Sequence, residues 1–199
     1  KGSFVYDDSD MVLENRNVTG RTTLYQLFFD KQVMVFPGEI YRPLRDVTYR
    51  FDFLIGKKEP FIYHASNIFF HIAATLTAYY FFISLLREGG ISFIAAAIFA
   101  VHPLHTESVA WIKGRDDILF TIFYLLALTM YLKHESSSLW KKQLYFLTSL
   151  LLYILSLFSK ELAITLPLSI ILYQAIFKKL NLFKLIPFIV VSAIYIGLR

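Results

Sequence analysis

The sequence predicts an all-α, polytopic helical membrane protein, from its composition and from the spacing of its apolar runs. The chain has 199 residues, of which 56% are hydrophobic and 18% aromatic, and its mean hydropathy is +0.53. A soluble domain is usually about 45–50% apolar. A full helical crossing needs roughly 17–25 apolar residues, so the shorter runs here predict tilted or half-length helices. The predicted spans are residues 61–86, 91–102, 116–133, 142–158, 162–177 and 185–198.

Residues 1–60 mix polar and aromatic side chains and predict a long extracytoplasmic loop that carries short amphipathic helices. Thr22 or Thr23 is suited to cap the first of these helices. A second helix is predicted over 43–55, because Pro43 fits its first position and apolar residues recur at helical spacing. Such a helix is expected to lie on the membrane surface. The chain thus divides into a loop region, 1–60, and a membrane region, 61–199.

The distribution of cations among the short loops predicts the orientation in the membrane. One set of loop ends carries seven cations, opposed only by Glu88 and Glu135. Assigning that side to the cytoplasm places 1–60, 102–115 and 159–161 together on the extracytoplasmic face. The seven cations are Arg87, Lys133, Lys141, Lys142, Lys178, Lys179 and Lys184.

The stretch from His102 to Asp117, HPLHTESVAWIKGRDD, places many ionisable groups between two apolar runs. Charges are costly in lipid, so this stretch is expected at a water interface, against protein or around a polar ligand. His102, His105 and Glu107 form the pattern H-x-x-H-x-E, in which two histidines on one helix face are able to share a metal. Because Pro103 is expected to start the helix after His102, polar contact with a substrate or with the 1–60 loop is the favoured interpretation.

Asp7 and Asp8 form a carboxylate pair in the loop region. One carboxylate could take a proton from an acceptor hydroxyl while the other positions that hydroxyl or a cation. The alternative is an ordinary solvated loop, because charged residues are mostly found exposed to water.

Two groups of charged residues are candidates for binding a phosphate. Arg42 and Arg45 flank the start of the predicted 43–55 helix, and arginine matches phosphate geometry bidentately; lipid headgroup contact with snorkelling is the alternative. Lys160 and Glu161 interrupt two apolar runs. Lys160 either meets a phosphate near the membrane boundary or simply pairs with Glu161 in a tight loop.

Several motifs, in order and spacing, resemble the membrane module of the transmembrane-and-TPR (TMTC) family of GT-C fold glycosyltransferases. They are FVYDD, YRPL, FIYHASNIFFH, FAVHPLHTESVAWIKGRDD and FSKELAITLPLSIILY, and the resemblance covers nearly the whole chain. It implies transfer of a sugar, mannose in the animal members, from a polyprenyl-phosphate carrier to a protein hydroxyl. It also implies an acidic catalytic pair, which matches Asp7 and Asp8. Asp117 occupies the aspartate of the family's GR-x-D motif, whereas Asp116 stands where a small residue is common.

The resemblance therefore predicts a GT-C-like glycosyltransferase in which Asp7 is the general base and Asp8 orients the acceptor or a metal. Cations are expected to hold the phosphate leaving group, because negative charge builds on its oxygen. No residue is assigned as a metal ligand, and a divalent metal stays possible beside the polyprenyl-phosphate-linked sugar donor. The phosphate-binding set is Arg42, Arg45, Arg115 and Lys160, and the further substrate-binding set is His102, His105, Glu107, Asp117 and Glu161.

The expected partners are the lipid-linked donor, a protein acceptor and membrane lipids. The net charge of +5 is interpreted as positive-inside bias, so nucleic acid is not expected. The membrane would be the endoplasmic reticulum in a eukaryote or the plasma membrane in a prokaryote. The family's first span is expected before Lys1 and its TPR repeats after Arg199, because no TPR period occurs in these residues.

Two alternative functions remain open at this point. One is a polyprenyl-phosphate-sugar transferase that acts on a lipid or glycan instead of a protein. The other is a non-enzymatic transporter or scaffold, which polar residues at mid-membrane depth and repeated architecture would favour. Here the charges gather at one surface and the sequence contains no evident inverted repeat.

Overall fold

The computed structural model describes Phe4, Asp8, Val12 and residues 14–29, 41–178 and 180–198, and its regular structure there is entirely helical. Asp7 and the VFPGE segment lie outside the described residues. The long helices are α3 (Pro43–Gly56), α4 (Pro60–Leu86), α5 (Gly89–Val101), α7 (Arg115–Ser136), α8 (Leu139–Ser159), α9 (Leu166–Phe177) and α10 (Ile186–Leu198). The short elements are α1 (Leu24–Phe29), α6 (His105–Ala110), η2 (Ile112–Gly114), η3 (Glu161–Thr165) and η4 (Leu182–Leu185).

Each predicted span coincides with a helix, within a few residues at either end. Among the described residues, three helices are long and apolar enough to cross a membrane: Pro60–Leu86, Ile112–Ser136 and Trp140–Ser159. The apolar helices Gly89–Val101, Glu161–Phe177 and Leu182–Leu198 are shorter, as the short runs predicted. The chain is therefore a helical membrane protein with both full-length and shorter apolar helices.

Local sequence signals explain where several helices begin. Pro43 and Pro60 occupy the first turns of α3 and α4, where the missing proline N–H costs nothing. The Glu88 carboxylate accepts hydrogen bonds from the backbone N–H groups of Gly90 and Ile91 and so caps α5. Thr23 caps α1 by accepting from the Gln26 N–H at 3.2 Å, which confirms the predicted capping position.

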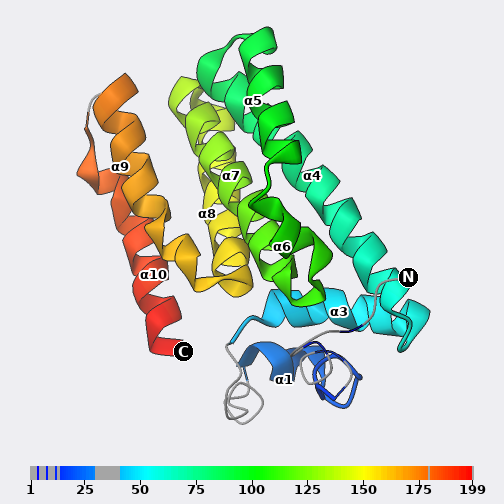
Figure 1. Ribbon diagram of the computed structural model, residues 1–199. Coiled ribbons are helices and arrows are strands. Elements are labelled where there is room, and N and C mark those ends of the chain that lie inside the picture. The colour runs from blue at the N-terminus through cyan, green and yellow to red at the C-terminus, as the bar shows by residue number, and fades with distance from the viewer. Residues whose placement is uncertain are drawn as a thin grey trace.

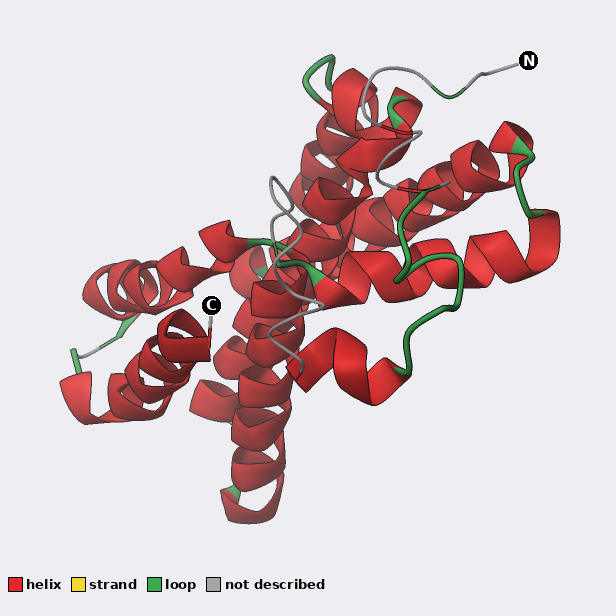
Figure 2. Cartoon of the chain, turned by 90° about the horizontal axis from the view of Figure 1, so that it is seen from below, coloured by secondary structure: helices red, strands yellow, loops and turns green. Residues whose placement is uncertain are grey.

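The long helices stand side by side, and α3 lies across one end of them (Figure 1). The view from that end shows α3 crossing the bundle (Figure 2). Helix α7 packs against α8 and α4, and α5 packs against α4. Consecutive helices alternate in direction, so the starts of α4 and α7 and the end of α8 meet near α3.

Small residues and internal hydrogen bonds hold the bundle together. Ala74 on α4 is buried against Ile118 and Ile122 on α7, in line with the close approach that small residues permit. The Ser149 hydroxyl on α8 donates to the Ala127 carbonyl of α7 at 2.7 Å. Apolar side chains on the outside of the bundle stay exposed, which suits contact with lipid tails.

The charged side chains of α3 pack against the bundle and the loop region, whereas its apolar side chains lie outward. Arg45, Asp46 and Tyr49 are buried, whereas Phe51 and Leu54 are 62% and 61% exposed. This arrangement fits the predicted helix on the membrane surface, with its apolar side chains directed at lipid.

The predicted orientation is testable with single cysteines, because the chain contains none. Lys58 lies after α3, Ser138 lies between α7 and α8, and both are exposed. We expect Lys58→Cys to react with a membrane-impermeant maleimide from the extracytoplasmic side, and Ser138→Cys only from the cytoplasmic side. The unsubstituted chain serves as the blank. Reaction of both cysteines from one side would overturn the orientation.

Candidate active site

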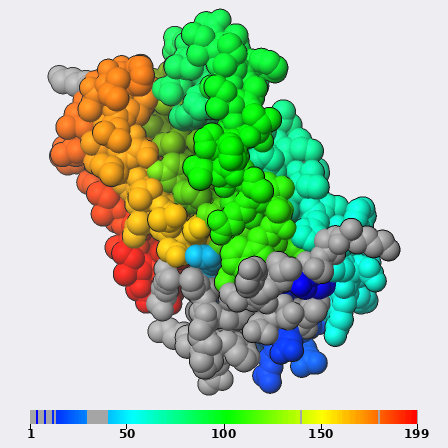
Figure 3. Space-filling model, viewed as in Figure 1, coloured from blue at the N-terminus to red at the C-terminus, as the bar shows by residue number. Residues whose placement is uncertain are grey.

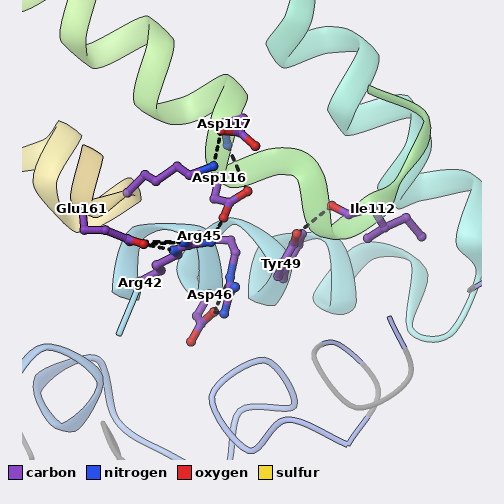
Figure 4. A network of polar contacts seen from close by, with 9 residues as sticks. Arg42, Arg45, Asp46, Tyr49, Ile112, Asp116, Asp117 and Glu161 are labelled. Carbon is purple, nitrogen blue, oxygen red and sulfur yellow. Dashed lines mark hydrogen bonds and ion pairs between the residues drawn. The ribbon is translucent and has the colours of Figure 1, made fainter. Parts of the chain in front are cut away.

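A cluster of ion pairs, some buried and some partly exposed, lies where α3, the start of α7 and the start of η3 meet (Figure 4). We call it the Arg42 cluster; it consists of Arg42, Asp116, Asp117, Lys160 and Glu161. Its members come from three separate segments of the sequence, which only the fold brings together.

Arg42 is the centre of the cluster. It precedes Pro43 at the start of α3, and only 8% of its side chain is exposed. Its guanidinium forms an ion pair with Asp116 and donates to Glu161 from Nη2 at 3.0 and 3.1 Å and from Nε at 3.3 Å. The planar guanidinium thus ties α3 to both α7 and η3.

Lys160 and Asp117 form the more open side of the cluster. Their side chains are 18% and 41% exposed and form an ion pair with each other. Lys160 is the extended residue between α8 and η3, and this break in the helix carries its ammonium group toward the start of α7. Because both side chains reach solvent, a ligand is able to replace one partner of this ion pair at a low cost. The buried Arg42–Asp116 pair does not allow such a replacement.

The charges in the Arg42 cluster are unequal. Among the described residues, three carboxylates face two cations: Asp116, Asp117 and Glu161 against Arg42 and Lys160. An anionic ligand that entered this cluster would have to displace a carboxylate from a cation or bring a further cation with it. Within the described residues, no group of three or more His, Cys, Asp or Glu side chains is arranged to hold a metal ion.

Arg45 lies one turn along α3 and faces the loop region. Its side chain is 1% exposed and donates to Asp46 Oδ1 from Nε at 3.0 Å and from Nη2 at 2.9 Å. Asp46 also accepts from the Asn17 amide at 3.2 Å. This pairing fastens the loop region to α3.

Asp8 is the one member of the acidic pair that the structure describes. It is fully buried, and its Oδ1 accepts the Lys113 backbone N–H at 3.2 Å. The loop acid therefore lies against the His102–Asp117 stretch despite 105 residues of separation, in agreement with the predicted contact between that stretch and the 1–60 loop.

Arg115 belongs to a second buried network, separate from the Arg42 cluster. It is 0% exposed and forms an ion pair with Asp52 at 2.6 Å. Its guanidinium also donates to Asn67 Oδ1 at 2.7 Å and to the Tyr63 carbonyl at 3.0 Å. Arg115 therefore joins α3, α4 and α7 through protein atoms on every side.

Tyr49 completes this second network. Its ring lies under the Arg115 guanidinium at 4.5 Å, and its hydroxyl donates to the Ile112 carbonyl at 2.6 Å. Burial raises the pKa of Tyr49 to about 12, against the opposing effect of Arg115 and Arg45. The hydroxyl therefore remains a donor that fixes η2 to α3.

Gly114 shows why the GR-x-D motif begins with glycine. A Cβ at this position would lie 2.6 Å from the Ser108 Cα and 2.8 Å from the Ser108 carbonyl oxygen. These are backbone atoms of α6, which cannot move aside easily. Glycine therefore lets η2 fold back on α6, and this turn places Arg115, Asp116 and Asp117 in the first turn of α7.

His102, His105 and Glu107 do not join the Arg42 cluster. His102 and Glu107 are exposed, and the two histidines line a largely apolar cavity of about 440 Å³ together with His64 and His71. Burial, followed by the charges of His71 and His102, lowers the pKa of His105. This cavity is thus lined by four imidazoles and by apolar side chains.

The fold and the site define a class: a helical membrane protein in which several ion pairs gather at one end of the bundle, between α3 and the ends of the long helices. Mouse protein O-mannosyl-transferase TMTC2 is 36% identical over 139 residues, which is 67% of this chain and 17% of that protein. Fruit fly (Drosophila melanogaster) protein O-mannosyl-transferase Tmtc1 is 35% identical over 81% of the chain and 19% of its own length. Protein O-mannosyl-transferase F38B6.6 of Caenorhabditis elegans is 34% identical over 85% of the chain and 25% of its own length.

The chain belongs to the TMTC family, as its motifs indicated. It spans a quarter or less of the length of these relatives. It matches no family profile and no solved structure.

Proposed function

We propose that this chain is the membrane part of a GT-C glycosyltransferase. It would move a mannose-like sugar from a polyprenyl-phosphate carrier to a protein Ser or Thr hydroxyl at the extracytoplasmic face. The observation that carries the proposal is the Arg42 cluster, in which Arg42 pairs with Asp116 and Lys160 pairs with Asp117 at the end of the bundle that α3 crosses. The names of the relatives supply the reaction, protein O-mannosyl transfer.

The cations of the Arg42 cluster suit a departing phosphate. When the bond from the sugar to the phosphate oxygen breaks, negative charge builds on that oxygen and must be stabilised. Arg42 already holds the two oxygens of Glu161, a planar pairing that a phosphate is able to copy. Lys160 lies on the more open side, so a phosphate reaches it by replacing Asp117, which then turns toward water.

The acceptor side of the proposed mechanism rests on the acidic pair. Asp7 takes the proton of the acceptor hydroxyl as that oxygen attacks the sugar carbon. Asp8, held by the Lys113 N–H, positions the segment that carries Asp7. We assign His102, His105 and Glu107 to acceptor contacts, because α6 leads directly into the turn that holds Asp8.

Arg45 and Arg115 act as positioning residues in this proposal. Their guanidinium groups are almost fully enclosed, at 1% and 0% exposure, and each already has carboxylate partners. They hold α3 against the bundle, which in turn places Arg42. The apolar face of α3 lies at the same level, so a lipid carrier is able to approach its phosphate site sideways from the membrane.

The experiment that tests the function uses the full protein in membranes that contain polyprenyl-phosphate-linked mannose, with the label on the mannose. We expect label on Ser or Thr of membrane and secreted proteins, detected by mass spectrometry, and its loss when the gene is removed. Label on a lipid or an oligosaccharide instead would support the alternative acceptor. The absence of any transfer would contradict the enzymatic proposal.

Lys160 and Asp117 are expected to affect donor use in opposite directions. Lys160→Ala removes a phosphate contact and should raise the KM for the lipid-linked donor about tenfold, as loss of one charge-assisted hydrogen bond does. Asp117→Asn removes the competing carboxylate and should leave this KM unchanged or lower. Steady-state kinetics over a range of donor concentrations measures both.

Both side chains reach solvent, so neither change is expected to unfold the protein. Lys58→Ala, an exposed cation near the same end, is the matched control. If Lys160→Ala and Lys58→Ala have the same donor KM, Lys160 does not contact the phosphate.

A further inference from the structure

A cavity at the opposite end of the bundle has the character of an anion site. It has a volume of about 470 Å³ and lies between the ends of α4, α7 and α9. Helix α7 separates it from the Arg42 cluster by about 30 Å, at 1.5 Å per residue. We call it the Arg87 cavity; the polar residues that line it are Ser84, Arg87, Lys133, Ser136, Tyr173 and Lys178.

Three cations from three helices line the Arg87 cavity, and none has a carboxylate partner among the described residues. Among the described residues, the side chains of Arg87 and Lys178 form no hydrogen bond or ion pair. Lys133 contacts the Tyr80 hydroxyl and lies 4.5 Å from the Tyr80 ring centroid.

Both nearby carboxylates are engaged elsewhere. Glu88 accepts from the backbone of Gly90 and Ile91. Glu135 accepts from Lys184 at 2.7 Å. The cations that line the cavity therefore outnumber the carboxylates near it among the described residues, in a position bounded by helices with apolar outer faces.

The backbone of Arg87 gives a second, independent observation. Arg87 ends α4 in the left-handed region, with φ at 58°, a position that usually takes glycine. A side chain is strained there, yet this one carries a cation into the cavity. The helix dipole alone does not explain this strained residue, because an unstrained cation elsewhere in the last turn would complement the dipole equally well.

An apolar cavity continues from the Arg87 cavity toward the membrane interior. It has a volume of about 260 Å³ and shares Leu85, Leu132, Tyr173 and Phe177 with the first. Its other walls are mainly apolar, including Phe81 and Leu128. Figure 3 shows the surface hollowed between the orange α9 and the green helices beside it.

We propose that the Arg87 cavity binds the phosphate of an anionic membrane phospholipid, with one acyl chain in the adjoining apolar cavity. The cations match the headgroup charge, whereas the hydroxyls of Ser84 and Ser136 already donate to backbone carbonyls of their own helices. The adjoining apolar cavity favours a lipid over a soluble phosphate, because a soluble phosphate has no acyl chain to place in it. Basic pockets between membrane helices on the cytoplasmic side are a known means of recognising lipid headgroups.

The test measures lipid retention by the full protein in detergent, using native mass spectrometry. We expect the protein to retain dioleoyl phosphatidylglycerol about tenfold better than dioleoyl phosphatidylcholine. The double variant Arg87→Gly/Lys178→Gln should lose most of this preference. Glycine suits the left-handed backbone at position 87. The melting temperature of this double variant in phosphatidylcholine should therefore match or exceed that of the unchanged protein.

The matched control is Lys141→Gln/Lys142→Gln, which removes two cations at the same end of the bundle but outside the cavity. An equal loss of preference in both double variants would show general surface attraction and overturn the proposal. Should Arg87→Gly/Lys178→Gln fail to fold, Lys178→Glu replaces it, since that side chain is exposed at the end of α9. A phosphatidylglycerol preference that survives Lys178→Glu overturns the proposal equally.

A soluble competitor separates the two sources of phosphate. Glycerol 3-phosphate carries the headgroup chemistry without acyl chains and should not displace phosphatidylglycerol at equal concentration. Displacement would assign the Arg87 cavity to a soluble phosphate and overturn the lipid assignment.

Discussion

Asp7→Asn is expected to lower the rate of sugar transfer by about 10²–10⁴, the usual contribution of a general base. Asparagine keeps the shape and most of the hydrogen bonding of aspartate but has no comparable basicity. Donor binding should persist, because the proposed phosphate contacts come from the Arg42 cluster. Single-turnover transfer to an acceptor peptide measures the rate, and retention of the labelled donor measures binding.

Asp8→Asn and Glu14→Gln complete this experiment. Asp8 is buried and accepts the Lys113 N–H, a bond that asparagine is also able to accept, so its replacement should cost less than that of Asp7. Glu14 is exposed in the same segment and should not affect transfer. A larger loss with Asp8→Asn would reverse the two roles, and normal rates for both aspartate variants would mean that the pair is not catalytic.

The helices were predictable because their signals are local. Apolar runs, Pro43, Pro60 and the cap at Thr23 all act within a few residues, and the structure follows them closely. The helical period of α3 also showed that one of its faces is apolar. Which neighbours its charged face would contact depends on tertiary packing, and no local pattern contains that information.

The pairings within the site were less predictable for the same reason. The sequence placed Arg42, Lys160 and the start of α7 on one face, but it gave Asp116 little weight because the family usually has a small residue there. Asp116 is instead buried against Arg42. Asn67 and Asp52 were also missed, although a polar amide and a carboxylate beside apolar membrane runs are costly unless paired.

Arg115→Met is expected to destabilise the folded protein by about 3–5 kcal/mol, the usual cost of removing one partner of a buried ion pair. Asp52, whose side chain is 7% exposed, would keep only the Ser66 hydroxyl, which donates to it at 2.6 Å. The Asn67 side-chain oxygen would lose its partner as well. The midpoint of unfolding in mild detergent measures the change.

The double variant Arg115→Met/Asp52→Leu separates pairing from packing. Because it leaves no buried charge without a partner, it should recover part of the lost stability. Lys58→Met, an exposed cation near the same end, should change the stability by less than about 0.5 kcal/mol. If Arg115 instead contacts the donor phosphate, Arg115→Met would raise the donor KM at nearly unchanged stability. The expected result is instead a loss of stability, because protein atoms surround the Arg115 guanidinium completely and a phosphate cannot reach it.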